Sequence, residues 1–211
     1  MRIHFALLAI LCSVTAGVVQ AAEWKQLFNG KDLTGWKMTG PGRFVVENGE
    51  MVTEGGMGLL FYEGEKFGNA TIRVVFKATT DHDNSGVVIR LPEKPADPWY
   101  GVHNGYEVQI DARGDEWHST GALYSLSKVS ERRQKAVGEW NTMDIVLQGQ
   151  KTIVILNGKT VNEFVGNQPV PERKQWYEPI RGPRPDAGYI GLQNHDKNST
   201  VHFKEISVKK N

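Results

Sequence analysis

The sequence has almost no cysteine: Cys12 is the only one in 211 residues. It also lacks a surplus of charge, with 25 Lys and Arg against 24 Asp and Glu. A protein that binds nucleic-acid backbones presents a strongly basic surface, so no nucleic-acid partner is expected. The apolar and charged fractions, 39% and 23%, are those of an ordinary globular domain and exclude a disordered or collagen-like chain.

The N-terminal apolar run, residues 5–14, is too short to span a membrane. Arg2 precedes this run, and Val19-Gln20-Ala21 offers the small residues that a signal peptidase recognises. We therefore interpret residues 1–21 as a secretory signal peptide and residues 22–211 as a single domain. A buried N-terminal helix is the alternative, but no capping residue marks its start. Since Cys12 falls within the signal, the mature domain has no thiol, which excludes disulfides and thiol catalysis.

A sustained helical period is missing as well, and short runs rich in Val, Ile, Thr and aromatic residues alternate with turn residues. Asn48-Gly49 and Asn157-Gly158 each separate two alternating runs and predict hairpins over residues 44–53 and 153–164. Further strands are expected at residues 70–78, 86–91, 106–112, 122–125, 141–148, 189–194 and 201–209. Closely spaced strands without helical crossovers predict an all-β fold, a sandwich of two antiparallel sheets.

Two stretches rich in proline and aromatic residues interrupt this rhythm, at residues 92–104 and 167–186. Long ordered loops in a compact domain are often functional. Their aromatic rings, that of Trp99 among them, could stack on sugars. The alternative is that the tryptophans only close the edges of the sandwich.

Three predicted strands carry a polar stripe opposite an apolar one, because side chains alternate along a strand. The stripes hold Arg90 in the first strand, Glu107, Gln109 and Asp111 in the second, and Gln193 and His195 in the third. Each stripe could be a solvent face, but solvent faces favour Lys, Glu and Thr, whereas Gln, His, Arg and paired carboxylates are typical of sugar-binding clefts. We expect Arg90, Glu107, Gln109, Gln193 and His195 to converge on one concave face, with Val108 and Ile110 in the core.

Six motifs stand in a recognisable order: LFNGKDLTGW at residues 27–36, NSGV at 84–87, GYEVQI at 105–110, TGALY at 120–124, GEWN at 138–141 and GYIGLQNH at 188–195. In this order and spacing they resemble the 3-keto-disaccharide hydrolase domain family, over residues 27 to about 208. The resemblance implies a jelly roll of the concanavalin A-like lectin and glucanase type. It also implies export to the periplasm or exterior of a bacterium, and hydrolysis of glycosides whose sugar is already oxidised at C3.

Carried onto this chain, the resemblance implies a site formed by the six polar residues of the stripes, and we add Trp99 and Tyr124 as substrate-binding residues. A charged loop, residues 128–135, departs from the small neutral loop of many members and leaves the outer part of the substrate open.

A C3 ketone acidifies the C2 hydrogen of a sugar, so a base can remove that proton, the C1 substituent can leave by elimination, and water can add back. The base is expected to be Glu107 or His195, and Asp111 the acid that protonates the leaving group. Arg90 is expected to stabilise the enolate, while Gln109 and Gln193 hold hydroxyls.

Two alternatives stay open. The Glu107-x-Gln109-x-Asp111 strand resembles the Glu-x-Asp-x-Glu strand of jelly-roll glucanases, so the two carboxylates could act by displacement at C1. A non-catalytic carbohydrate-binding module would need stacking rings and hydroxyl acceptors, but no acid or base.

Motifs for other chemistries are missing, with no glycine-rich phosphate loop and no His-Glu-x-x-His. No cofactor and no catalytic metal are therefore expected. Asp81-x-Asp83-x-Ser85 resembles part of a calcium loop but lacks its closing Glu, which favours a solvated turn. A structural calcium ion stays open, since lectin folds often carry one. The expected partner is a carbohydrate substrate, with no membrane span, and the oligomeric state does not follow from the sequence.

Overall fold

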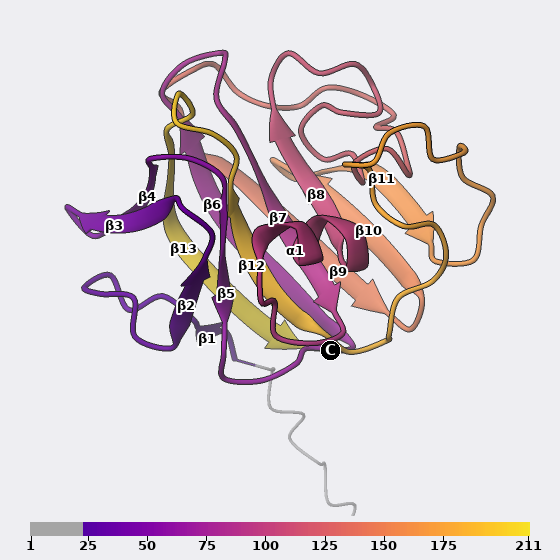
Figure 1. Cartoon of the computed structure of the whole chain (residues 1–211), viewed down its shortest axis with the longest axis horizontal. Coiled ribbons are helices and arrows are strands. Elements are labelled where there is room, and N and C mark those ends of the chain that lie inside the picture. The colour runs from indigo at the N-terminus through magenta and orange to yellow at the C-terminus, as the bar shows by residue number, and fades with distance from the viewer. Residues whose placement is uncertain (1–22) are drawn as a thin grey trace, which may run out of the picture.

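The computed structural model describes residues 23–211, so the predicted signal peptide at residues 1–21 lies outside the described residues. Thirteen strands and one short helix make up the secondary structure of the described part (Figure 1). In chain order they are β1 Lys25–Gln26, β2 Trp36–Thr39, β3 Arg43–Glu47, β4 Glu50–Glu54, β5 Gly58–Tyr62, β6 Ala70–Ala78, β7 Asn84–Leu91, α1 Pro98–Asn104, β8 Tyr106–Asp111, β9 Asn141–Gln148, β10 Lys151–Leu156, β11 Lys159–Val165, β12 Tyr189–Asn194 and β13 Val201–Lys210.

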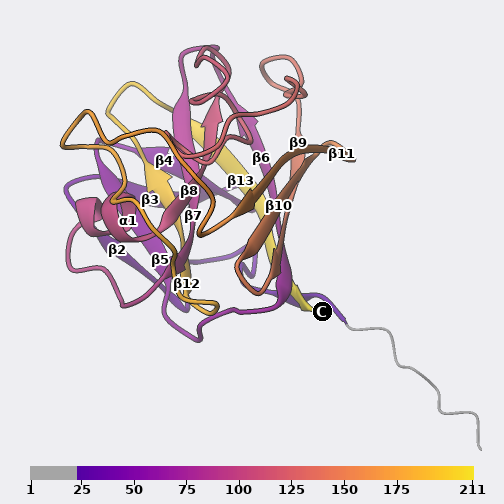
Figure 2. The ribbon, with the colours of Figure 1, turned by 90° about the vertical axis from the view of Figure 1, so that its right-hand side faces the viewer.

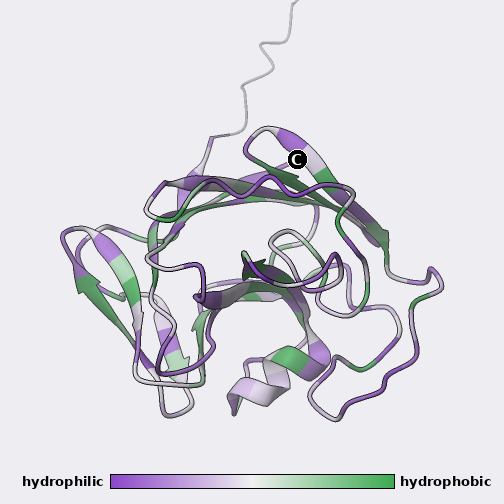
Figure 3. Cartoon of the chain, turned by 90° about the horizontal axis from the view of Figure 1, so that it is seen from above, coloured by the Kyte–Doolittle hydropathy of each residue, from purple (hydrophilic) through white to green (hydrophobic). Residues whose placement is uncertain are grey.

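The strands form two antiparallel sheets packed face to face, which confirms the predicted all-β sandwich. The larger sheet has eight strands in the order β11-β10-β9-β6-β13-β4-β3, with β1 added beside β13. The smaller sheet has five, in the order β2-β5-β12-β7-β8. Both sheets are curved, and α1 lies against the outer face of the smaller one (Figure 3). That outer face is therefore partly covered by α1, whereas the inner faces enclose the core.

Both Asn-Gly hairpins are confirmed. Asn48 and Gly49 join β3 to β4 with φ angles of 51° and 80°, and Asn157 and Gly158 join β10 to β11 with 51° and 82°. Two consecutive residues with positive φ are what a tight hairpin turn with the right-handed twist of its strands requires.

The predicted register of β8 and β12 in the smaller sheet is also confirmed. Val108 and Ile110 of β8 lie in the core between the sheets, as do Ile190 and Leu192 of β12. Alternation then directs the odd-numbered side chains of β8 to the outer face. A slip by one residue would have exchanged the two faces.

The sequence prediction was wrong at two places. Residues 122–125, expected to be a strand, form turns, because Ser125 has a φ of 56° and the N–H groups of Leu126 and Ser127 both donate to the Leu123 carbonyl. Residues 92–104, read as a loop, contain α1, whose first turn is capped by the Asp97 side chain and begins with Pro98. β1, β2 and β5 were not predicted either.

Two buried arginines connect the long loop of residues 166–188 to the sandwich through hydrogen bonds to backbone carbonyls. Arg90 donates to the carbonyls of Pro185 and Asp186 at 3.2 and 3.0 Å. Arg184 donates to the carbonyls of Gly105 and His103 at 3.2 and 3.0 Å. Figure 2, turned by 90° from Figure 1, shows this loop running along the side of the molecule between β11 and β12. The helix α1 in residues 23–211 is too short to cross a membrane.

Candidate functional site

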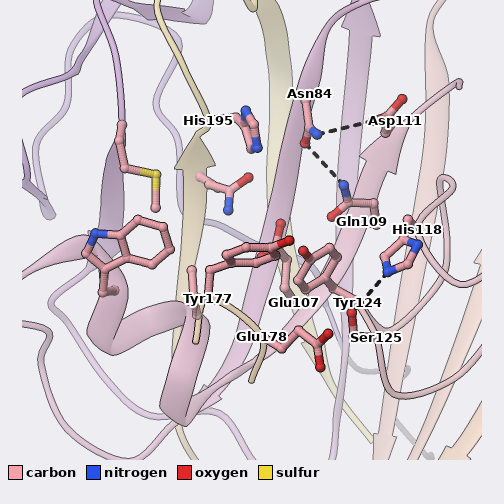
Figure 4. Close-up of a pocket in the computed structure, with 14 residues that line it drawn as sticks. Asn84, Glu107, Gln109, Asp111, His118, Tyr124, Ser125, Tyr177, Glu178 and His195 are labelled. Atoms are coloured by element: carbon pink, nitrogen blue, oxygen red, sulfur yellow. Dashed lines mark hydrogen bonds between the residues drawn. The ribbon is translucent and has the colours of Figure 1, made fainter. Parts of the chain in front are cut away.

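A cavity of about 550 Å³ lies on the outer face of the smaller sheet. Strands β7, β8 and β12 form its floor, α1 forms one wall, and the loops after β8 and after β11 form the others (Figure 4). Its lining residues are Met57, Asn84, Trp99, Val102, Glu107, Gln109, Asp111, His118, Tyr124, Ser125, Tyr177, Glu178, Gln193 and His195.

Seven of the eight predicted site residues line this cavity. They are Trp99, Glu107, Gln109, Asp111, Tyr124, Gln193 and His195. They come from four separate stretches of sequence, and the period of two along β8 and β12 had placed most of them on this face. The structure thus brings them together, while the chemical role of each one stays a prediction.

Arg90 was wrongly placed in the cleft. Its φ of 56° and a register shift in the pairing of β7 with β12 break the alternation of β7 just before this residue. The side chain turns into the interior, where it is 1% exposed and donates to the carbonyls of Gly149 and Lys151 on the larger sheet. Arg90 therefore ties the two sheets together and does not stabilise an enolate.

Glu107 is the buried carboxyl at the floor of the cavity, with 6% exposure. Its side chain lies over Gly86 of the neighbouring strand, where an added Cβ would come within 2.6 Å of the Glu107 Cγ. Gly86 therefore makes room for the carboxyl. Burial raises the pKa of Glu107 to about 8, and a hydrogen bond with the Gln193 side chain offsets part of that rise.

A chain of two side-chain hydrogen bonds links Gln109 to Asp111 through Asn84 at the floor of the cavity. The Gln109 Nε2 donates to Asn84 Oδ1 at 3.2 Å, and the Asn84 Nδ2 donates to Asp111 Oδ2 at 3.1 Å. The other oxygen of Asp111 accepts the backbone N–H of Arg113 at 2.7 Å. Since both oxygens already accept N–H groups, Asp111 is suited to orienting Asn84 and Gln109.

Two residues that line the cavity have a buried amide oxygen without a donor. The Oε1 atoms of Gln109 and Gln193 accept no hydrogen bond from any described residue, and the side chains are only 3% and 4% exposed. A buried acceptor left unpaired costs free energy, about 1–3 kcal/mol. The amide nitrogen of Gln109 is meanwhile used within the floor, where it donates to Asn84.

Sequence reasoning missed several lining residues, and the signals for them differ. Asn84 is the first residue of the NSGV motif and begins β7, so the alternation of that strand could have identified it. His118 and Ser125 belong to an irregular segment whose turns no period describes. Tyr177 and Glu178 lie in the aromatic loop at residues 167–186. Its composition indicates a functional loop, but it has no period that identifies which side chains face a cavity.

Two histidines at the cavity are each held by a carboxylate. The Nδ1 of His118 lies 2.7 Å from Asp115 Oδ1, and its Nε2 lies 3.0 Å from the Ser125 Oγ. On the other side of the cavity, the Nδ1 of His195 lies 2.7 Å from Asp196 Oδ2. Figure 4 shows His118 and His195 on opposite sides of Glu107.

Aromatic rings form the wall beside α1. The rings of Trp99 and Trp176 are 4.6 Å apart between centroids, and Tyr177 follows at 5.9 Å from Trp176. Trp176 is 63% exposed, although indole rings are usually largely buried. An exposed indole that packs on two rings of the cavity wall is suited to stacking on a sugar or another flat group.

The turn that resembled a calcium loop is filled by the protein's own donors. Its Asp83 carboxylate accepts the backbone N–H groups of Thr79, Thr80 and Thr200, at 2.6, 2.8 and 3.0 Å. Asp83 therefore closes the turn between β6 and β7. Within residues 23–211, no group of three or more His, Cys, Asp or Glu side chains is arranged to hold a metal ion.

Comparisons with known proteins agree with this architecture. The family model of the 3-keto-alpha-glucoside-1,2-lyase-like domain matches residues 23–209. A Parabacteroides distasonis protein, provisionally described as a glycosyl hydrolase, is 26% identical, with 90% of this chain and 100% of that chain covered and a TM-score of 0.74.

Two sugar-binding structures share the fold. The carbohydrate-binding module CBM66 from Bacillus subtilis is 14% identical, with 83% and 95% of the chains covered and a TM-score of 0.57. The exoplasmic domain of VIP36, in a form bound to Ca²⁺ and Man3GlcNAc, is 12% identical, with 84% of each chain covered and a TM-score of 0.53. At such identities the likeness shows the fold alone. No curated protein is significantly similar to the chain.

Proposed function

This chain belongs to the family of 3-keto-alpha-glucoside-1,2-lyase-like domains, and we propose that it cleaves glycosides whose sugar carries a ketone at C3. The observation that carries the proposal is Glu107, a buried carboxyl at the floor of the cavity. A carboxylate whose pKa is raised to about 8 is a much stronger base than an ordinary one and is suited to removing a carbon-bound proton.

The reaction begins at C2, whose hydrogen the adjacent ketone acidifies. Glu107 takes that proton, and the electron pair of the C2–H bond delocalises onto the C3 oxygen as an enolate. The pair then forms the C1–C2 double bond while the C1–O bond to the leaving group breaks. Addition of water across the double bond completes a net hydrolysis.

The developing enolate oxygen needs a neutral hydrogen-bond donor, the role that the sequence had assigned to Arg90. Tyr124 is the better candidate, because it lines the same cavity as Glu107. Burial and the nearby Glu107 carboxyl raise the pKa of Tyr124 to about 12, which keeps its O–H protonated. A preorganised donor of this kind stabilises charge that appears only in the transition state.

The test compares a 3-keto-disaccharide with the same disaccharide lacking the ketone, in deuterated buffer. We expect cleavage of the keto substrate alone, with solvent deuterium at C2 of the hydrated product. Cleavage with the C2 hydrogen fully retained would rule out elimination and favour displacement at C1 by Glu107 and Asp111. The Glu107→Gln variant should lose roughly 10² to 10⁴ in rate.

A second candidate is a carbohydrate-binding module without activity, favoured by the exposed Trp176 and by the fold that the chain shares with the module CBM66. Such a module would bind the keto sugar and its parent with similar affinity and release no product. Calorimetry on both sugars, followed by product analysis of the same samples, separates the two functions.

Export is part of the proposal, on the basis of the N-terminal sequence alone. Cleavage after Ala21 would give a mature protein that begins at Ala22. N-terminal sequencing of the protein from a periplasmic or culture fraction tests this, and an intact Met1 on the fractionated protein would contradict it.

A further inference from the structure

We propose that His118, fixed by Asp115 and acting through the Ser125 hydroxyl, is the acid that protonates the leaving group. This inference rests on the proposed function and adds the step that Glu107 cannot perform. Elimination needs a proton acceptor at C2 and a proton donor at the leaving oxygen, and one carboxyl cannot face both atoms at the same moment.

The first observation is how firmly the imidazole is held. Asp115 Oδ1 lies 2.7 Å from the Nδ1 of His118 and also accepts the backbone N–H of Trp117 at 2.9 Å. The Asp115 carbonyl in turn accepts the backbone N–H of His118 at 3.1 Å. With Nδ1–H bonded to the carboxylate, the Nε2 is the atom that exchanges protons, and it lies 3.0 Å from Ser125 Oγ.

Ser125 itself is held in a rare backbone conformation. Its φ of 56° is uncommon for a residue other than glycine, and its side chain has only 7% exposure. The backbone N–H of Ser125 donates to the Trp117 carbonyl at 3.3 Å, which ties the serine to the turn that carries His118. Such conformations concentrate at functional sites, where the surrounding structure maintains them.

The second observation is where this pair lies. A smaller cavity of about 240 Å³ adjoins the larger one, and both are lined by His118, Ser125 and Glu178. Glu107 lines only the larger cavity, and the smaller one is bordered by polar side chains that include Lys174 and Arg181. If a glycoside placed its keto sugar over Glu107 and its leaving group in the smaller cavity, the scissile oxygen would lie where the two cavities meet, beside His118 and Ser125.

The remaining histidine is less suited to this role. His195 is also paired with a carboxylate, but it lines the larger cavity only. Figure 4 places it on the side of Glu107 away from His118. A leaving group that extends toward Lys174 departs on the side of His118.

The proton balance of the step is complete. As the C1–O bond breaks, the leaving oxygen takes the proton of the Ser125 hydroxyl, and Ser125 takes the proton from Nε2 of the His118 imidazolium. Glu107 ends protonated and His118 ends neutral, with its Nδ1–H still bonded to Asp115. The His118 side chain is 39% exposed, so water can return its proton before the next turnover.

The test uses two substrates with the same keto sugar and different leaving groups. A disaccharide releases an alcohol that must be protonated, whereas a 4-nitrophenyl glycoside releases a phenolate that is stable without a proton. We expect His118→Ala to slow disaccharide cleavage by roughly 10² to 10⁴ and nitrophenyl release by less than about tenfold. Ser125→Ala should show the same selectivity, and added imidazole should restore part of the disaccharide activity of His118→Ala.

The controls separate this inference from the proposed function. Glu107→Gln should lose activity on both substrates, because C2 deprotonation precedes either departure. His202→Ala removes another carboxylate-bound histidine and should retain both activities. The Nδ1 of His202 lies 2.7 Å from Glu50 Oε2, and both residues belong to the larger sheet, away from the cavity. If the wild type cleaves both substrates but His118→Ala slows them equally, or spares the disaccharide, the role of His118 is wrong. If the wild type cleaves neither, the proposed function fails and this inference falls with it. Should His118→Ala unfold, His118→Gln makes the same comparison.

Discussion

Replacing Glu107 by glutamine should remove a pH-dependent loss of stability that the buried carboxyl imposes on the wild type. Burial raises the pKa of Glu107 from its ordinary value of 4.5 to about 8. Between these two values the folded protein keeps a proton that the unfolded chain has released. The free energy of unfolding therefore falls as pH rises through this window, and it is unaffected by Glu107 below it.

The expected size of the effect follows from the width of the window. One pH unit corresponds to about 1.4 kcal/mol per proton, so roughly three and a half units correspond to a loss of about 5 kcal/mol at most. Glutamine stays neutral and resembles the protonated acid in shape. At pH 5 we expect Glu107→Gln to be as stable as the wild type within about 1 kcal/mol, and at pH 9 to be several kcal/mol more stable.

The assay is urea unfolding at pH 5, 7 and 9 and at constant ionic strength, followed by tryptophan fluorescence. Equal slopes against urea for variant and wild type would show that the same surface is exposed in both. Glu139→Gln, at an exposed turn position, is the matched control and should show no pH-dependent gain. A stability difference between Glu107→Gln and the wild type that stays constant from pH 5 to pH 9 would refute the reasoning.

The remaining predictions concern the floor of the cavity, the buried Arg90, the Tyr124 hydroxyl and the aromatic wall. Gly86→Ala should cost about 1–3 kcal/mol of stability and most of the activity, because its Cβ would displace the Glu107 carboxyl; thermal unfolding and turnover measure the two effects. Arg90→Leu should destabilise the fold by about 3–5 kcal/mol, measured by urea unfolding, since it leaves several buried carbonyls unpaired; a variant that folds normally but has lost activity would return Arg90 to the site. Tyr124→Phe should lower kcat by roughly 10² to 10³ with little change in KM, and an unchanged kcat would remove Tyr124 as the enolate donor. Trp176→Ala should raise KM several-fold for a disaccharide and for a methyl glycoside alike, because its indole packs on Trp99, away from the smaller cavity; an unchanged KM for both would exclude stacking of Trp176 on the substrate.

The period of two along β8 and β12 was sufficient to predict most of the site. It placed Glu107 and Gln193 on the face opposite Val108 and Leu192, and the Asn-Gly turns fixed two of the hairpins. Those patterns depend only on local backbone geometry, which each strand keeps along its length.

The errors arose where that geometry changes within a few residues. The irregular pairing near the end of β7 turns the Arg90 side chain into the interior. No residue in the sequence 86–91 indicates that the backbone of an arginine there has a positive φ. His118 and Ser125 meet because the turns between them are held by tertiary hydrogen bonds, such as the bond from the Ser125 N–H to the Trp117 carbonyl. Contacts of that kind have no period in the sequence.

The two arginines that hold the loop of residues 166–188 also determine how a sugar meets the protein. Because Arg90 and Arg184 bind main-chain carbonyls, the loop that carries Tyr177 and Glu178 is already in place before a ligand arrives. Binding then loses little conformational entropy in this wall, and association need not wait for a slow closing motion. If the proposed function holds, this preformed wall would exclude glycosides whose leaving group does not fit the opening beside it.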